Sequence, residues 1–310
     1  MSSSATAALL QRAVALHQQG KFDAALALYR QVLDDEPRQA DALHLSGVVH
    51  RQQGDARRAV ELIEQAIAVD PAPARPHCNL GAALADLGQT AQALASYERA
   101  IARDPAYALA HANRGNALRT LGRAVEAIAS YERALALNPA SIDAASGRAI
   151  ALNELGRHHD ALAAAEASLR LRPAHVDGWA ARGNALAALG EFAEALASFE
   201  RAIGLHAGRA DLLGWRGGAQ FKLGRCADAL ASFDASLALR PAHAGTVLRR
   251  AAVSSGVSAR GLKTRPSSAG RFSLSSIASS TARLPLLWVT STVRPRRSAA
   301  VTNSDANSAK

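Results

Sequence analysis

Seven glycines, each 34 residues beyond the last, constrain this chain more than any other feature of its 310 residues. They are Gly20, Gly54, Gly88, Gly122, Gly156, Gly190 and Gly224. Alanines follow in the same phase at Ala25, Ala59, Ala93, Ala127, Ala161, Ala195 and Ala229. Prolines complete the register at Pro37, Pro71, Pro105, Pro139, Pro173 and Pro241, with Ala207 in the one remaining place. Three series in one register predict a stack of identical supersecondary units.

Each 34-residue repeat is predicted to be a pair of helices. The glycine can adopt the left-handed conformation that ends a first helix. Acids then lie in the first turn of a second helix, where the positive end of the helix dipole favours them; they are Glu126, Asp160, Glu194 and Asp228. The proline ends that second helix because it disfavours a helical conformation in the residue before it.

Small and large residues also alternate in phase. The eighth position of the repeat is small throughout: Ala13, Gly47, Gly81, Gly115, Ala149, Gly183 and Gly217. Glycine inside a helix costs about 1 kcal/mol relative to alanine, so we expect the first helix to approach the alanine series of the second closely. Sixteen residues later stand Tyr29, Ile63, Tyr97, Tyr131, Phe199 and Phe233, which we expect to pack against the next repeat. Ala165 takes this place in the fifth repeat and predicts a weak interface there.

This spacing and these residue types resemble the tetratricopeptide repeat (TPR) family, and the resemblance covers residues 6–241. It places the starts of the repeats at Thr6, Ala40, Ala74, Ala108, Ile142, Val176 and Ala210, with a partial eighth from Ala244. The resemblance implies an all-α, right-handed α-solenoid of seven helical hairpins over residues 1–251, with a concave groove lined by the first helices.

Asparagine recurs at positions that, by this resemblance, face the groove. An Asn amide offers donors and an acceptor that can pair with the backbone of an extended peptide. The candidate peptide-binding residues are Asn79, Asn113, Asn116, Arg119, Asn153 and Asn184. The alternative is that Asn at these positions is common in TPR proteins and has no ligand. The series also resembles part of the Asn ladder of O-linked N-acetylglucosamine transferases, although Leu45, Gly147, Ala181 and Trp215 interrupt it.

Arginines and aromatic residues in the first helices have simpler interpretations. We expect Arg114, Arg148, Arg182 and Arg216, which share one repeat position, to lie across packed helices and pair with nearby acids. Trp215 and Phe221 are possible anchors for a partner, but packing in the core is the favoured interpretation.

The net charge of +10 belongs entirely to the end of the chain. Residues 246–310 hold 11 Lys and Arg and a single acid, Asp305, so residues 1–245 are neutral. The repeat pattern fails after Ala251, where Ser258, Lys263 and Ser267 stand in place of the expected glycine, alanine and large side chain. Residues 252–310 are rich in Ser, Ala and Arg, a composition typical of disorder.

Three interpretations of residues 252–310 are open. A basic tail could bind nucleic acid or an anionic surface through charge. A disordered tail could have no role. The third interpretation, which we favour, is a shifted reading frame beyond residue 250. The repeat pattern changes abruptly inside one helix, and the second helix of the seventh repeat would lack a covering helix.

No catalytic motif accompanies the repeats. The phosphate-binding loop, the dinucleotide fingerprint, the nucleophile elbow and the zincin motif are all absent from the sequence. Cys78 and Cys226 are far apart, and His158, His159 and Asp160 cannot readily share one metal ion, so neither a cofactor nor a metal site is predicted. No stretch has the apolar length of a membrane span, and a cytoplasmic location is expected.

The sequence therefore predicts a non-catalytic scaffold that binds a protein or peptide and no small-molecule substrate. The alternatives are the substrate-recognition array of a truncated or frameshifted glycosyltransferase resembling the O-linked N-acetylglucosamine transferases, and nucleic-acid or anionic-surface binding through the basic tail.

Overall fold

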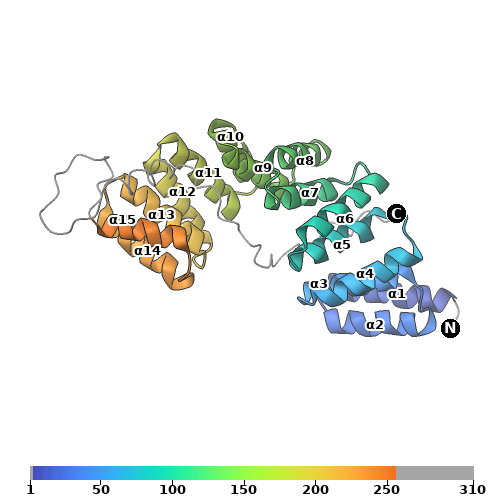
Figure 1. Ribbon diagram of the computed structural model, residues 1–310. Helices are drawn as coiled ribbons and strands as arrows, with labels where there is room; N and C mark the ends of the chain where they lie inside the picture. Colours follow the sequence, from blue (N-terminus) through green and yellow to red (C-terminus); the bar gives the residue numbers. More distant parts are fainter. Residues whose placement is uncertain (1–2, 256–310) are drawn as a thin grey trace, which may run out of the picture. The chain divides into compact units, whose positions relative to one another are not determined.

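A computed structural model describes residues 3–255, and this part of the chain consists of fifteen α-helices without a strand (Figure 1). The predictions for residues 256–310 concern a segment outside the described residues. The described chain forms two compact units that divide between Asn138 and Pro139. We refer to residues 3–138 as the N-terminal unit and to residues 139–255 as the C-terminal unit.

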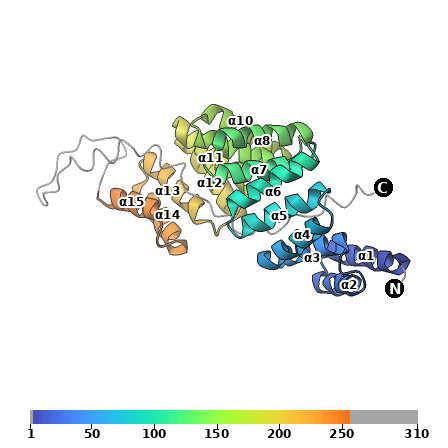
Figure 2. The ribbon, with the colours of Figure 1, turned by 45° about the vertical axis from the view of Figure 1, so that its right-hand side comes forward.

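The N-terminal unit contains four helical hairpins. Its helices are α1 (Ser3–Gln18), α2 (Phe22–Asp35), α3 (Ala40–Gln52), α4 (Ala56–Val69), α5 (Ala74–Asp86), α6 (Thr90–Arg103), α7 (Ala108–Thr120) and α8 (Ala124–Leu137). Figures 1 and 2 both show α1 to α4 as two stacked pairs at one end of this unit. The first helices of the second, third and fourth repeats begin at the residues where the sequence places the repeat starts.

The C-terminal unit contains three hairpins and one further helix. Its helices are α9 (Ile142–Glu154), α10 (His158–Leu171), α11 (Val176–Leu189), α12 (Phe192–Leu205), α13 (Ala210–Lys222), α14 (Cys226–Leu239) and α15 (Ala244–Ser254). Helix α15 is the first helix of the partial eighth repeat. It packs on α14, with Val253 in the same apolar cluster as Ala229 and Phe233. The expectation that the second helix of the seventh repeat lacks a covering helix was therefore wrong.

The glycine series ends the first helices as predicted. All seven glycines have a positive φ, between 73° and 90°. At Gly54, for example, the backbone turns so that the amides of Gly54 and Asp55 donate to the carbonyls of Arg51 and His50. These bonds satisfy carbonyls at the end of α3 that have no partner within the helix.

The small residue at the eighth position packs against the large side chain of its own repeat. A Cβ added to Gly81 would lie 2.6 Å from the Tyr97 ring and 3.0 Å from the carbonyl oxygen of Ala93. The predicted approach to the alanine series is thus confirmed. The large side chain, however, lies over the glycine within its own hairpin, so our expectation that it packs mainly on the next repeat was incomplete. At Gly81 the missing Cβ leaves room for the Tyr97 ring between the two helices.

Within each compact unit, neighbouring first helices approach one another more closely than neighbouring second helices do. This difference curves each stack toward its first helices. We call the surface formed by the first helices the inner face of each unit. The candidate peptide-binding residues all belong to first helices, so each lies on the element that forms this face.

Candidate functional site

A row of side-chain contacts between successive first helices builds the inner face of the N-terminal unit. Each contact joins residues 35 positions apart, one more than the repeat length. The contacts are His17 Nε2 to Gln52 Oε1 at 2.8 Å, Arg51 Nε to Asp86 Oδ2 at 2.7 Å, Asn79 Nδ2 to His44 Nε2 at 2.8 Å and Asn113 Nδ2 to Cys78 Sγ at 3.7 Å. The row fixes polar side chains on four neighbouring helices in a constant register.

Asn79 is half-buried on α5, and its amide donates to the imidazole of His44 on α3. The pKa of His44 is lowered to about 4, mainly by burial and to a smaller extent by the nearby Arg75 and His17 charges. His44 is consequently neutral at pH 7, with Nε2 free of a proton and able to accept. One edge of the Asn79 amide is held by this bond, which orients the rest of the group.

Asn113 and Asn116 lie one turn apart on α7. Asn113 is half-buried, and its only polar side-chain contact with a described residue is the long, weak one to the Cys78 sulfur. Asn116 is exposed, and its Oδ1 accepts a hydrogen bond from the Tyr131 hydroxyl at 2.7 Å. No described residue accepts from the Asn116 Nδ2. These two amides and that of Asn79 are the predicted site residues that the structure brings together on neighbouring helices. Arg119 is half-buried one turn further along α7.

Asn153 and Asn184 belong to the C-terminal unit and have different environments. Asn153 is buried, and its Nδ2 donates to the backbone carbonyl of Ala181 at 2.9 Å, which ties α9 to α11. The Oδ1 of Asn184 is buried and receives no hydrogen bond from a residue of the described chain.

Two acids at the start of first helices of the C-terminal unit, Asp177 and Asp211, are paired with one arginine. Arg209 donates to Asp211 through Nε at 3.1 Å and Nη2 at 2.6 Å, and it also contacts Asp177 through Nη1. These two carboxylates raise the pKa of Arg209, against the effect of its burial. The aspartates thus serve as partners of Arg209 rather than as an acidic surface.

Two of the four predicted arginines at the seventh repeat position, Arg114 and Arg182, pair with acids of second helices, as predicted. Arg114 contacts Glu98 at 3.2 Å and donates to Ser130 at 2.7 Å. Arg182 contacts Glu166 at 3.4 Å and donates to Ser198 at 2.8 Å. Arg216 instead donates to the hydroxyl of Ser232 at 3.0 Å.

The aromatic residues of the seventh repeat pack in the core. The ring centroids of Trp215 and Phe199 are 5.9 Å apart, and Trp215 also contacts the apolar cluster that contains Leu212. Phe221 packs against the cluster of Ala229, Phe233 and Val253. The favoured interpretation of both as core residues agrees with these contacts.

One type of contact within the repeats was not predicted from the sequence. Ring nitrogens at the fourth repeat position lie within hydrogen-bond distance of the proline carbonyl of the preceding loop: His77 to Pro71 at 3.1 Å, His111 to Pro105 at 3.0 Å and Trp179 to Pro173 at 2.8 Å. The constant separation of six residues between the ring and the proline was the available signal.

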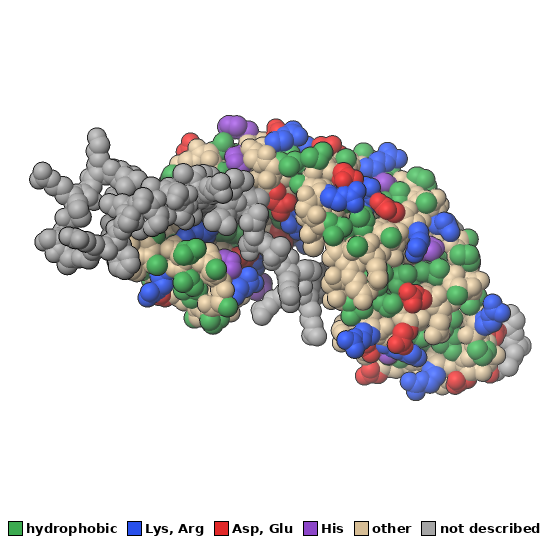
Figure 3. Space-filling view, viewed as in Figure 1, with side chains coloured by type: hydrophobic (Ala, Val, Ile, Leu, Met, Phe, Trp, Pro, Cys, Tyr) green, Lys and Arg blue, Asp and Glu red, His purple; other side chains and the backbone are tan. Residues whose placement is uncertain are grey.

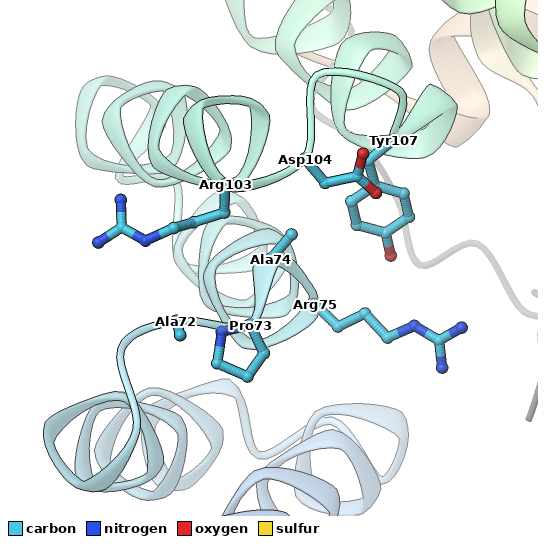
Figure 4. A pocket seen from close by; sticks show the side chains of 7 residues that line it. All are labelled: Ala72, Pro73, Ala74, Arg75, Arg103, Asp104 and Tyr107. Carbon is cyan, nitrogen blue, oxygen red and sulfur yellow. The ribbon is translucent and has the colours of Figure 1, made fainter.

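A shallow depression of about 450 Å³ opens at the loop edge of the N-terminal unit. It is lined by Ala72, Pro73, Ala74, Arg75, Arg103, Asp104 and Tyr107. The guanidinium groups of Arg75 and Arg103 point in opposite directions (Figure 4), and Arg103 donates to the carbonyl of Pro71. The two cations therefore do not converge on one anionic group.

Charges of both signs are interspersed on the face that Figure 3 shows, in keeping with the neutral repeats. None of the helices in the range 3–255 is both long and apolar enough to span a membrane. The same range holds no cluster of three or more His, Cys, Asp or Glu side chains in a metal-binding arrangement.

The two units are thus built from stacked helical hairpins of one design, which defines an α-helical repeat protein. The chain belongs to the tetratricopeptide repeat family, whose model matches residues 10–76, 78–142, 146–211 and 180–244. No curated protein sequence matches the chain.

Solved structures share this fold. A tetratricopeptide repeat protein from Parabacteroides merdae matches with a TM-score of 0.63 at 18% identity, over 81% of this chain and 100% of that one. The APC/C hetero-tetramer Cut9-Hcn1 matches with a TM-score of 0.70 at 16% identity, over 78% of this chain and 48% of that one. Pseudomonas aeruginosa pilF matches with a TM-score of 0.59 at 20% identity, over 68% and 96%. At these identities the likeness concerns the fold alone.

Proposed function

We propose that this chain is a protein-interaction scaffold that binds an extended peptide segment on the inner face of its N-terminal unit. Proteins with this repeat fold are in general non-enzymatic scaffolds for protein partners, which supports the class of function. Binding of an extended peptide at this face is supported by the arrangement of Asn79, Asn113 and Asn116 on two adjacent first helices.

These amides are suited to a main-chain ligand because two of the three, Asn79 and Asn116, are oriented by the protein. His44 holds one edge of Asn79, and Tyr131 holds Oδ1 of Asn116. The Asn116 amide nitrogen keeps its donors for a ligand carbonyl. A preoriented side chain loses less conformational entropy when a ligand binds, so it contributes more net affinity than a mobile one.

Small side chains flank these amides and leave room for a backbone. Ala82 and Ala85 lie on α5, at inner-face positions that the resemblance assigns to the groove, and both are partly exposed. Short side chains let a peptide backbone come within hydrogen-bond distance of the amides, and they make few demands on peptide sequence. We therefore expect affinity to depend on an extended conformation more than on particular ligand side chains.

Selection of peptides from a random library on the full chain tests this proposal. The selected peptides should lose about tenfold or more in affinity for the triple variant Asn79→Ala, Asn113→Ala, Asn116→Ala. The matched control replaces Gln92, Arg99 and Arg133, which are exposed on second helices, by alanine, and should bind like the unaltered chain. Equal binding of the peptides by the triple variant would contradict the proposed site.

A further inference from the structure

Helix α15 presents one packed face and one open face. Thr246 and Val253 are buried on the side toward α13 and α14. Val247 and Ala251 are exposed, with 44% of Val247 accessible. These two residues occupy the fourth and eighth positions of the repeat.

In complete repeats the same two positions are covered by the second helix of the hairpin. At the fourth position Leu43, His77, Ala145 and Leu213 are only 4–8% exposed, and Leu9, His111 and Trp179 are half-buried. Ala13 and Ala149, at the eighth position, are fully buried. The open face of α15 is therefore the surface that in every complete hairpin of this chain receives a second helix, and no residue of the described chain covers it.

Arg250 on α15 also lacks a polar contact that the equivalent arginines of complete repeats make. Like Arg114 and Arg182 it occupies the seventh position, and it pairs with Asp234 of the preceding helix. Those two arginines also donate to a serine of their own second helix, Ser130 and Ser198. The Arg250 side chain has no such serine and is 46% exposed, against 26% and 22% for the other two.

The second helices of this chain define what fits such a surface. Four of them carry an alanine followed four residues later by an aromatic residue, with serine immediately before the aromatic and an acid immediately after it; they span residues 93–98, 127–132, 195–200 and 229–234. The alanine permits close approach, the aromatic ring covers the eighth position, and the serine accepts from the arginine. An alanine at the eighth position also accommodates a ring, because Ala13 and Tyr29 are both fully buried in the first repeat.

The charge of α15 favours an acidic partner helix over a second copy of this chain. Helix α15 carries Arg249 and Arg250 and no acid, so two copies of it would repel each other. Residues 256–267 place Lys263 and Ser267 where the alanine and the aromatic would have to be. Second helices such as α12 instead carry an acid in the first turn, and Glu194 there lies 3.5 Å from Arg182.

We propose that the open face of α15, formed by Val247, Arg250 and Ala251, is a docking site for an acidic amphipathic helix of a partner protein. The partner helix would carry the alanine, serine and aromatic spacing of the second helices and would complete the eighth hairpin in trans. This mode is helix-in-groove recognition, and it is independent of the peptide site on the inner face.

A synthetic peptide of residues 191–205, labelled for fluorescence anisotropy, is the probe. It should bind the full chain saturably, and Val247→Asp should weaken binding about tenfold or more. A peptide in which alanine replaces the residue corresponding to Phe199 should bind about as weakly. Val125→Asp, at an exposed apolar residue of α8, is the matched control and should leave binding unchanged, as should the triple asparagine variant.

Absence of saturable binding, or equal binding by Val247→Asp, would overturn the proposal. Circular dichroism of each variant checks that it is folded. Sedimentation of the chain alone is a second test, in which we expect a monomer. A dimer that Val247→Asp abolishes would show that a second copy of the chain covers this face, and it would refute a partner helix.

Discussion

The phenol hydroxyl of Tyr131 donates a hydrogen bond to Oδ1 of Asn116 at 2.7 Å across the hairpin of the fourth repeat. In the sixth repeat Phe199 occupies the position of Tyr131, and Asn184 that of Asn116. Phenylalanine has no hydroxyl, and the buried Oδ1 of Asn184 has no donor among the described residues. At this pair of positions the sixth repeat thus lacks a hydrogen bond that the fourth repeat has.

Restoring this bond should stabilise the sixth repeat. Phe199→Tyr places a hydroxyl where Tyr131 has one and should raise stability by about 1 kcal/mol, the usual net value of a hydrogen bond. Tyr131→Phe should lower it by a similar amount. Urea unfolding followed by circular dichroism measures both. A destabilised Phe199→Tyr would show that the two hairpins are not equivalent in this respect.

Gly81, at the eighth position of the third repeat, should not tolerate a methyl group. A Cβ on Gly81 would lie 2.6 Å from the Tyr97 ring, so Gly81→Ala should destabilise by about 1–3 kcal/mol through overpacking, less the gain in helix propensity. Gly204 is the matched control because it is helical and a Cβ there meets nothing within 4 Å. Gly204→Ala should stabilise by about 0.5–1 kcal/mol. Thermal unfolding of the two variants should show opposite shifts.

Much of this fold could be predicted from the sequence because each helix boundary depends on local chemistry. A left-handed glycine and a proline recur in every hairpin or nearly so, and they place the ends of the helices within a residue or two. The lateral contacts could not be predicted in the same way. The pair His44 and Asn79 depends on a one-residue offset between repeats, which only the three-dimensional stacking determines.

The candidate site was predictable to a smaller extent. Asn79, Asn113 and Asn116 do lie on neighbouring first helices, but the same residue type serves a different purpose at Asn153. An asparagine can bond a ligand or a neighbouring helix with the same amide, and its repeat position does not distinguish the two. The deciding quantities are burial and the distance to the next helix, which are properties of the packed structure.

The contact between His44 and Asn79 should make stability depend on pH. The pKa of His44 is about 4 in the folded chain, below the usual 6.5, because burial disfavours the charged ring. The neutral ring therefore stabilises the fold above pH 6.5, and this contribution is lost as pH falls from 6.5 toward 4, by about 3 kcal/mol in total. Unfolding measured across this range should show the loss, and His44→Gln, which keeps an acceptor but does not titrate, should reduce it. An unchanged pH profile in His44→Gln would contradict this assignment.

Arg209 should be the most sensitive ion-pair residue of the C-terminal unit. It bridges Asp177 and Asp211, and only 13% of the Asp211 side chain is exposed. Arg209→Ala would leave Asp211 charged and largely buried, so we expect a loss of about 2 kcal/mol. Arg209→Lys keeps the charge but not the forked geometry, and its loss should be intermediate.

Arg225 provides the comparison for Arg209, since it pairs with Asp228 one turn away and both side chains are about half exposed. Arg225→Ala should cost less than about 0.5 kcal/mol, because solvent screens an exposed pair and holding two long side chains together costs entropy. Chemical unfolding in low and high salt separates the two cases. The effect of Arg225→Ala should vanish in high salt, whereas most of the effect of Arg209→Ala should persist because burial shields that network from ions. Equal losses for the two variants would mean that the bridge between Asp177 and Asp211 adds nothing beyond an ordinary surface pair.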